Sequence, residues 1–163
     1  MKPPIKNIGQ SVRTRLTDRA RAAGENTQLL LTRFAIERLM FRLAESKHRE
    51  MSVLKGAMLF SLWAPVPYRS TGDLDLLGRG NAAPEHIASV FRDICSQAVV
   101  DDGLVFDPAS VRTEISRAED EYSGVRVTLV ATLARARLPI QVDIGFGDVV
   151  TPSPQKIAYP SLL

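Results

Sequence analysis

Three aspartates stand in segments with the residue pattern of β-strands, where a carboxylate is costly unless it has a partner or a task. In Asp73-Leu74-Asp75-Leu76, the alternation of a strand places both carboxylates on one face and both leucines on the other. Two like charges at that spacing repel each other. A divalent cation bound between them would remove the repulsion, because such ions prefer hard oxygen ligands. The pair therefore points to a site for Mg²⁺.

A third carboxylate follows the same pattern near the end of the chain. The run from Leu138 to Phe146 places its apolar residues on one face, with Gln141, Asp143 and Gly145 on the other. Two carboxylates on one strand and a third on another make a Mg²⁺ platform for phosphoryl or nucleotidyl transfer, in which metal ions activate the attacking oxygen and stabilise the leaving pyrophosphate. The alternative is that the first pair lies on an edge strand and faces water, while Asp143 pairs with an arginine.

A phosphate-binding turn is predicted just upstream of the aspartate pair. Lys55-Gly56 closes a strand-like segment and opens a short apolar one. A glycine there lets a phosphate approach free backbone N–H groups, and Lys55 adds a positive charge. Arg69, Ser70 and Thr71 stand immediately before the pair and offer a guanidinium and hydroxyls to the same triphosphate. Lys55-Gly56 alone could be an ordinary strand-to-helix turn, but the order strand, glycine, helix, loop and D-x-D favours a functional site.

Helices and strands must position these residues, and the hydrophobic pattern predicts both. Helices are predicted over residues 11–23, over about 27–46 with Asn26 as the N-cap, and from Pro84 to about Val99. Gly124 and Pro139 are expected to mark breaks between the later strands. The order of helices, a βαβα unit and then several strands predicts an α+β or mixed α/β fold. The remaining predicted elements are a short helix over 57–63 and strands over 51–56, 73–77, 103–107, 110–115, 125–133 and 138–146.

Composition limits the class of protein. The 163 residues are 45% hydrophobic and 24% charged, which is ordinary for about one globular domain. The single cysteine, Cys95, excludes an intramolecular disulfide framework and a cysteine-rich zinc site, and two histidines, His48 and His86, make a histidine-based metalloenzyme unexpected. No segment approaches the roughly 20 apolar residues of a transmembrane helix, and the N-terminus lacks the apolar segment of a secretory signal. We therefore expect a cytoplasmic protein with no membrane partner.

The net charge of +3 is unevenly distributed along the chain. Residues 1–50 carry 11 of the 21 Lys and Arg residues but 5 of the 18 Asp and Glu residues, a net of +6, whereas residues 51–163 carry a net of −3. We divide the chain accordingly into an N-terminal basic helical segment, 1–50, and a core, 51–163. A basic segment attracts polyanions, although a solvated helix face is the more ordinary interpretation. The candidate nucleic-acid contacts are Arg13, Arg15, Arg19 and Arg21.

Together, the segments SVLKGAMLFSLW, YRSTGDLDLLG and QVDIGFGDVVTP resemble the AbiEii/AbiGii nucleotidyltransferase toxins of bacterial abortive-infection and type IV toxin–antitoxin systems. That family belongs to the DNA polymerase β-like nucleotidyltransferase superfamily. The resemblance implies an α+β fold, with a small mixed β-sheet flanked by helices and an N-terminal helical segment. It also implies transfer of NMP from an NTP, with Mg²⁺ or Mn²⁺, to a tRNA or a protein hydroxyl, and a cognate antitoxin as a partner.

The resemblance also assigns roles to individual residues. The matched positions are Lys55 and Gly56 for the phosphate turn, Arg69, Ser70 and Thr71 for its polar lead-in, Asp73 and Asp75 for the metal pair, and Asp143 for the third carboxylate. Two departures stand out: Ala57 and Met58 follow the glycine where a second small residue or a hydroxyl is usual, and the chain stops at Leu163, where family members usually continue into a helical half. The second hypothesis is therefore an incomplete or degenerate transferase domain that acts as a non-enzymatic binding or regulatory module.

A weaker alternative is a dinucleotide-binding fingerprint. Residues 78–83, Gly-Arg-Gly-Asn-Ala-Ala, match G-x-G-x-x-A between a strand and a helix, and Asp102 lies at a spacing suited to a ribose contact. The first strand carries two aspartates where a buried, apolar parallel strand is expected, which disfavours a dehydrogenase. Cys95 stands among apolar neighbours on a predicted helix and is expected to be a core residue rather than a nucleophile.

Overall fold

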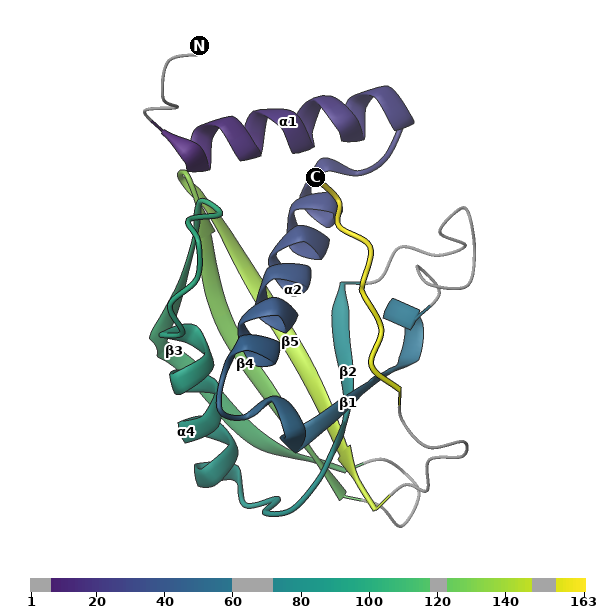
Figure 1. Ribbon diagram of the computed structural model, residues 1–163, viewed down its shortest axis with the longest axis vertical. Coiled ribbons are helices and arrows are strands. Elements are labelled where there is room, and N and C mark those ends of the chain that lie inside the picture. Colours follow the sequence, from purple (N-terminus) through teal and green to yellow (C-terminus); the bar gives the residue numbers. More distant parts are fainter. Residues whose placement is uncertain (1–6, 60–71, 118–122, 148–154) are drawn as a thin grey trace.

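A mixed β-sheet of five strands carries the fold in the computed structural model, which describes residues 7–59, 72–117, 123–147 and 155–163. The strand order is β1-β2-β5-β4-β3 (Figure 1). The strands are β1 (Ser52–Lys55), β2 (Asp73–Gly78), β3 (Leu104–Arg117), β4 (Ser123–Leu133) and β5 (Ala136–Phe146). β2 and β5 are parallel, and the other neighbouring pairs are antiparallel. The predicted α+β class with a small mixed sheet is confirmed.

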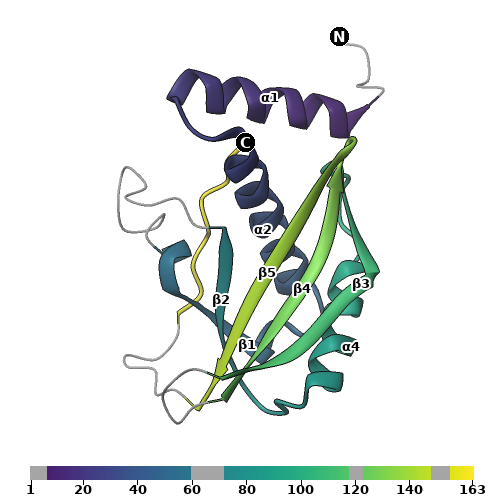
Figure 2. The ribbon, with the colours of Figure 1, turned by 180° about the vertical axis from the view of Figure 1, so that it is seen from behind.

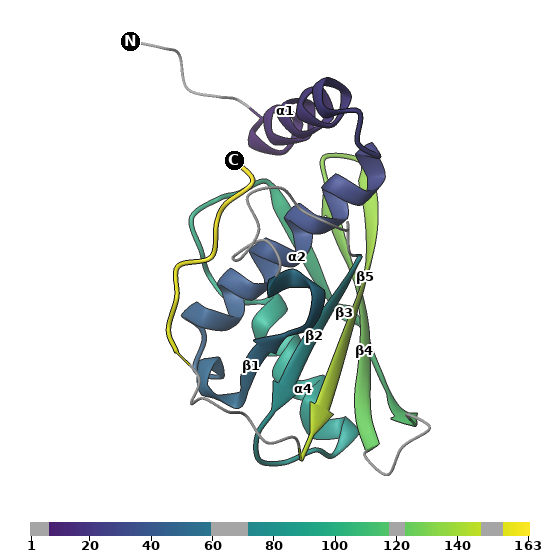
Figure 3. The same cartoon turned by 90° about the vertical axis from the view of Figure 1, so that its right-hand side faces the viewer.

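Three α-helices accompany this sheet in the described part of the chain: α1 (Ile8–Ala23), α2 (Thr27–Glu45) and α4 (Pro84–Cys95). Two short 3₁₀ turns, η1 (Arg49–Met51) and η2 (Gly56–Leu59), flank β1. Seen from the side, α2 and α4 lie against one face of the sheet, and α1 crosses the end of the fold (Figure 3). The view from behind shows that none of the described helices covers the opposite face (Figure 2). None of the described helices is both long enough and apolar enough to span a membrane.

Two of the three described helices, α1 and α2, begin where a polar N-cap satisfies a free N–H group. The Asn26 side chain accepts a hydrogen bond from the Leu29 N–H at 2.9 Å, as predicted for the start of α2. Asn7 does the same for the Gln10 N–H at 2.9 Å, so α1 begins at Ile8 rather than at residue 11. α4 starts with Pro84 as predicted, but it ends at Cys95 rather than near Val99. At this end, both the hydroxyl and the N–H of Ser96 donate to the Arg92 carbonyl.

The core forms between the helices and one face of the sheet. Val12 and Leu16 of α1, Phe34 and Ile36 of α2, and Phe91 of α4 belong to one buried cluster. The strands contribute alternate residues to the same cluster, as their pattern predicts. Those from β2 and β5 are Leu74, Leu76, Leu138, Ile140, Val142 and Ile144. This burial fixes the orientation of the sheet, so the intervening polar residues of β2 and β5 must face away from the helices.

Three predicted strand breaks are wrong. Residues 103–107 and 110–115 are parts of one strand, β3, in which the register against β4 shifts between Asp107 and Arg112. Gly124 lies inside β4, and Pro139 lies inside β5, opposite Val130. Proline is tolerated there because β2 pairs with residues 141–146 and not with Pro139, so among the described strands this part of β5 has a neighbour on one side alone. The helix predicted over 57–63 begins as η2, and the rest of it lies outside the described residues.

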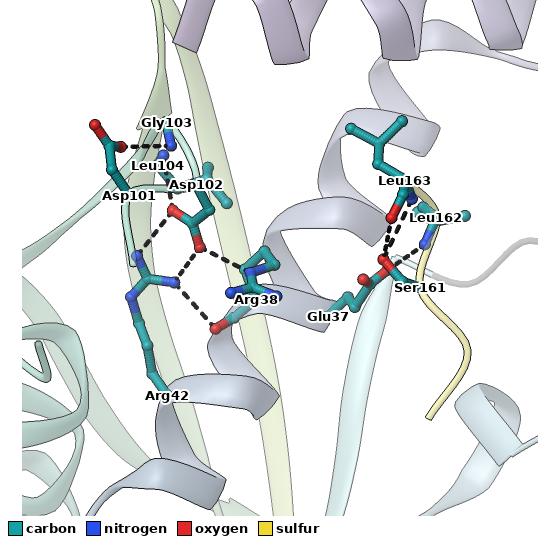
Figure 4. A network of polar contacts seen from close by, with 10 residues as sticks. All are labelled: Glu37, Arg38, Arg42, Asp101, Asp102, Gly103, Leu104, Ser161, Leu162 and Leu163. Carbon is teal, nitrogen blue, oxygen red and sulfur yellow. Dashed lines mark hydrogen bonds and ion pairs between the residues drawn. The ribbon is translucent and has the colours of Figure 1, made fainter. Parts of the chain in front are cut away.

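A charged cluster anchors α2 to the start of β3 (Figure 4). Asp102 accepts hydrogen bonds from Arg38 Nε at 2.8 Å and from Arg42 Nη1 and Nη2 at 2.7 and 3.0 Å. Burial alone would raise the pKa of Asp102, but the hydrogen bonds from Arg42 and Arg38 outweigh it and lower the pKa below its ordinary range. Arg42 also lies over the Phe106 ring, 4.6 Å from its centre. This cluster therefore holds the helical layer in a fixed position against the sheet.

Candidate active site

The aspartate pair of β2 lies on the face of the sheet that the helices leave open. Asp73 is exposed and Asp75 is half-buried, whereas Leu74 and Leu76 between and after them are buried. Strand alternation predicts this division. Asp143 also lies on the open face, because its neighbours Val142 and Ile144 are buried in the core.

The parallel register places Asp75 of β2 directly opposite Asp143 of β5. The row continues across the sheet in both directions. Lys55 of β1 is the partner of Asp75, and Arg126 of β4 is the partner of Asp143. Glu114 of β3 stands opposite Arg126 and completes the row. Two adjacent carboxylates are thus flanked by a cation on each side.

The central carboxylates influence each other's charge. Burial raises the pKa of the Asp75 carboxyl above its ordinary range, and the nearby carboxylates of Asp143 and, less strongly, Asp73 raise it further. The Lys55 ammonium offsets part of this effect. Asp75 is therefore a carboxylate that gains from a further positive charge beside it, and a bound cation would supply that charge.

Asp143 has partners of its own. Its Oδ1 accepts a hydrogen bond from Arg126 Nε at 2.8 Å, and its Oδ2 accepts one from Gln141 Nε2 at 3.1 Å. The hydrogen bond to Asp143 raises the pKa of Arg126 above its ordinary range. The structure therefore confirms the alternative that the sequence analysis left open for Asp143, an ion pair with an arginine. Sequence analysis had not identified that arginine, because the contact depends on which strands are neighbours.

Carboxylate oxygens are the donors that a hard divalent cation prefers, but the three aspartates do not surround a single point. Asp75 and Asp143 are neighbouring carboxylates, and relief of their repulsion would favour a cation. However, no three acidic, histidine or cysteine side chains among the described residues gather closely enough to hold a metal ion. The three aspartates thus share one face without converging on one point, and a cation there would need further oxygen ligands, such as water molecules or the phosphates of a nucleotide.

The predicted glycine turn lies against the aspartate pair. Gly56 has a φ of +75°, which favours glycine, and a Cβ built on it would stand 2.5 Å from Oδ2 of Asp75. The position therefore disfavours any larger residue on two grounds. Lys55 ends β1 immediately before this turn, in register with Asp75. The structure thus brings Lys55, Gly56 and Asp75 together, while Arg69, Ser70 and Thr71 lie outside the described residues.

The C-terminal segment, residues 155–163, reaches the same turn from the helical side. Tyr159 donates its hydroxyl to the carbonyl of Met58 in η2 at 2.7 Å. Further along, the Leu162 N–H donates to the buried carboxylate of Glu37 on α2 at 3.0 Å (Figure 4), and Arg19 of α1 donates to the Leu162 carbonyl. Sequence analysis missed these contacts. The local signal was a tyrosine and two leucines in a short segment with no periodic pattern.

The basic helix lies at a distance from the carboxylates. The start of α1 contacts the β4–β5 turn, where a Cβ built on Gly9 would stand 3.2 Å from the Ala134 nitrogen. Asp143 lies nine residues further along β5, which corresponds to about 30 Å of extended strand. The candidate contacts differ in environment: Arg15 and Arg21 are exposed, Arg13 is half-buried, and Arg19 already bonds the Leu162 carbonyl.

The other candidate sites have structural explanations. The dinucleotide alternative requires adjacent parallel strands, but β2 and β3 are separated by β5 and β4. Asp102, its candidate ribose ligand, is instead bonded to Arg38 and Arg42. Cys95 is a buried core residue, as predicted, and burial raises the pKa of its thiol to about 11. A thiol with that pKa is a poor nucleophile at neutral pH.

Comparison with known proteins identifies the family. The family model described as "Nucleotidyl transferase AbiEii toxin, Type IV TA system" matches residues 38–163, which include the glycine turn and all three aspartates.

A solved structure, "Crystal structure of putative nucleotidyltransferase from H. pylori", is 16% identical to this chain, with a TM-score of 0.49. The match covers 78% of this chain and 49% of that one. This chain thus spans about half the length of that protein. No curated protein matches it. As the sequence resemblance predicted, the chain belongs to the nucleotidyltransferase AbiEii toxin family of type IV toxin–antitoxin systems.

Proposed function

We propose that this chain transfers a nucleoside monophosphate from an NTP to an acceptor, with Mg²⁺ or Mn²⁺, on the open face of the sheet. The observation that supports this most strongly is the contact between the glycine turn and Asp75. Nucleotidyl transfer needs the triphosphate and the metal-binding carboxylates to be adjacent, because a cation held by the carboxylates would have to offset charge on the phosphates. A glycine pressed against a half-buried aspartate meets that requirement with residues of this chain alone.

Each residue has a proposed task in that reaction. The backbone at Gly56 and the ammonium of Lys55 bind the triphosphate, with help from the segment Arg69-Ser70-Thr71 that precedes β2. Asp73 and Asp75 hold the cation, and Asp143 lies beside them to complete its ligands and orient the acceptor. When bound, the cation offsets charge on the phosphates and stabilises the leaving pyrophosphate.

The proposed acceptor is a tRNA, with a protein hydroxyl as the alternative. The basic helix α1 supports the RNA acceptor, since it lies too far from Asp143 for one small molecule to contact both, whereas a folded RNA is large enough. Exposed arginines such as Arg15 and Arg21 would then bind its phosphates. A cognate antitoxin is the proposed partner in the cell, because the family is that of type IV toxin–antitoxin systems.

Two observations favour a second candidate function, a non-enzymatic nucleotide-binding or regulatory module. Asp143 is already paired with Arg126, and the described acidic residues form no three-membered metal group. A domain that no longer assembles its metal site could still bind an NTP at the glycine turn. The two functions differ in one measurable property, the transfer of label from an NTP to an acceptor.

The test is incubation of the protein with Mg²⁺, each of the four α-labelled NTPs, and either a tRNA pool or a protein mixture. Label transfer that is lost in Asp73→Ala and retained in Asp107→Asn would support the enzyme. Asp107 is a suitable control because it is an exposed aspartate of the same sheet, on β3. If folded protein transfers no label from any NTP to either acceptor but still binds an NTP, the module is the better description.

A further inference from the structure

We propose that Arg126 is a positioning residue that holds Asp143 in the absence of metal and competes with the divalent cation for its carboxylate. The inference rests on the proposed function, since it concerns the cation that the aspartates would bind. It adds a residue of β4 to a site that otherwise consists of β1, η2, β2 and β5. Neither the motif pattern nor the family resemblance had pointed to β4.

The first argument is the occupancy of the Asp143 carboxylate. Arg126 Nε donates to one oxygen and Gln141 Nε2 to the other, at 2.8 and 3.1 Å. Both oxygens therefore already accept a hydrogen bond. A cation that coordinates Asp143 must displace one donor or share an oxygen with it, and the charged guanidinium would repel the arriving cation. Gln141 is neutral and offers no such opposition.

The second argument is the order of charges across the sheet. Arg126 is the register partner of Asp143, and Asp143 is the register partner of Asp75. Without Arg126, Lys55, on the far side of Asp75, would be the one cation left beside these two carboxylates in the register row of described residues. Arg126 thus supplies, in the metal-free protein, part of the charge that a cation would supply when bound.

The third argument is the partial exposure of the pair. The side chains of Arg126 and Asp143 are 39% and 28% exposed. Ion pairs at such positions are weak enough to be exchanged for another partner. A long guanidinium side chain at the surface can swing into solvent when a cation arrives, whereas a buried pair such as that of Arg42 and Asp102 could not be released without loss of packing.

The experiment measures Mn²⁺ binding to the full chain by the electron paramagnetic resonance of free Mn²⁺, without NTP or acceptor. Arg126→Gln should bind Mn²⁺ about two- to fivefold more tightly than the wild type, the range expected for a partly exposed charge pair. Arg126→Lys, which keeps the charge, should remain closer to the wild type. In an Asp143→Asn background, Arg126→Gln should change the affinity for Mn²⁺ little, because the carboxylate for which Arg126 and the cation compete is absent.

Stability gives a second readout that does not depend on activity. Metal-free Arg126→Gln should melt at a lower temperature than the wild type, and Mn²⁺ should raise its melting temperature by more. Arg112→Gln is the matched control, since Arg112 is an exposed arginine of β3 whose guanidinium bonds only the carbonyls of Ala109 and Val111 among the described contacts. If Arg126→Gln does not fold without metal, Mn²⁺ should restore its far-UV circular dichroism.

The outcomes separate this inference from the proposed function. If the wild type binds Mn²⁺ and loses it in Asp75→Asn, but Arg126→Gln binds equally or more weakly, the competition is refuted and the metal site stands. Failure of Mn²⁺ to restore an unfolded Arg126→Gln would refute it as well. If neither the wild type nor Arg126→Gln binds Mn²⁺ even with NTP present, the metal-dependent function fails together with the inference.

Discussion

Gly56 and Asp75 are in direct contact, although they belong to different elements and lie 19 positions apart in the numbering. A Cβ built on Gly56 would stand 2.5 Å from Oδ2 of Asp75 and 2.9 Å from its Cβ. The φ of +75° at Gly56 adds a second constraint, because residues with a side chain rarely adopt it. The missing side chain thus makes room for the carboxylate and permits the turn.

Gly56→Ala should therefore cost more stability than a positive φ alone explains. Gly80 provides the control, since its φ is +79° but a Cβ there would meet nothing within 4 Å. We expect Gly80→Ala to lower the free energy of unfolding by about 1 kcal/mol, and Gly56→Ala by about 2–3 kcal/mol because Asp75 must also move. Urea denaturation measures both losses. Equal losses would mean that the contact with Asp75 has no energetic consequence.

Local patterns predicted those parts of the fold and of the site that depend on residues close together in the sequence. The alternation of Asp73 and Asp75 with buried leucines, and the cap at Asn26, depend on backbone geometry that a few residues determine. The same is true of the glycine turn after β1. These features follow from the periodicity of a strand, the chemistry of a helix start and the conformational freedom of glycine.

The pairing of Asp143 with Arg126 could not be derived in this way. It requires knowledge that β4 is the neighbour of β5 and of the register between them, both of which depend on packing across the whole sheet. The strand breaks expected at Gly124 and Pro139 failed for a related reason. Local propensity disfavours both residues in strands, but proline fits where one side of β5 has no partner among the strands that the structure describes.

The pH dependence of stability should reveal the Asp75 carboxyl. Its pKa is raised in the folded protein, mainly by burial and then by Asp143. At a pH below the pKa that Asp75 has in the unfolded chain, Asp75 is protonated in both the folded and the unfolded state. Its raised pKa then does not lower the free energy of unfolding. As the pH rises through the raised pKa, the folded state must ionise a carboxyl beside a like charge, and stability decreases relative to low pH.

Asp75→Asn removes this cost. In EDTA, its melting temperature should exceed that of the wild type increasingly as the pH rises from about 4 to about 7, with a gain of about 1 kcal/mol or less at neutral pH. Asp107→Asn, at an exposed position of β3, serves as the control and should show no such trend. A wild type that loses no stability relative to Asp75→Asn over this range would contradict the charge arrangement.

The C-terminal segment should be held to the glycine turn by Tyr159. Tyr159→Phe removes the hydroxyl that bonds the Met58 carbonyl and should weaken docking by about 1 kcal/mol. Trypsin cleavage after the exposed Lys156 should then be about fivefold faster, because cleavage follows the undocked fraction. Cleavage after Arg135, exposed in the β4–β5 turn, should remain unchanged and serves as the internal control. Unchanged cleavage after Lys156 would show that the hydroxyl does not hold the segment.

Binding of the proposed RNA acceptor should depend steeply on salt through α1. Each phosphate contact that is lost reduces the slope of log affinity against log salt by about 0.7–0.9, so the double variant Arg15→Gln/Arg21→Gln should reduce it by about 1.4–1.8. Filter binding of a tRNA pool over a series of KCl concentrations measures this slope. The control is Arg79→Gln/Arg92→Gln, which removes the same charge at exposed positions outside α1. An equal reduction in the control would show that net charge, rather than the basic helix, attracts the RNA, and binding that does not vary with salt would remove α1 from the acceptor site.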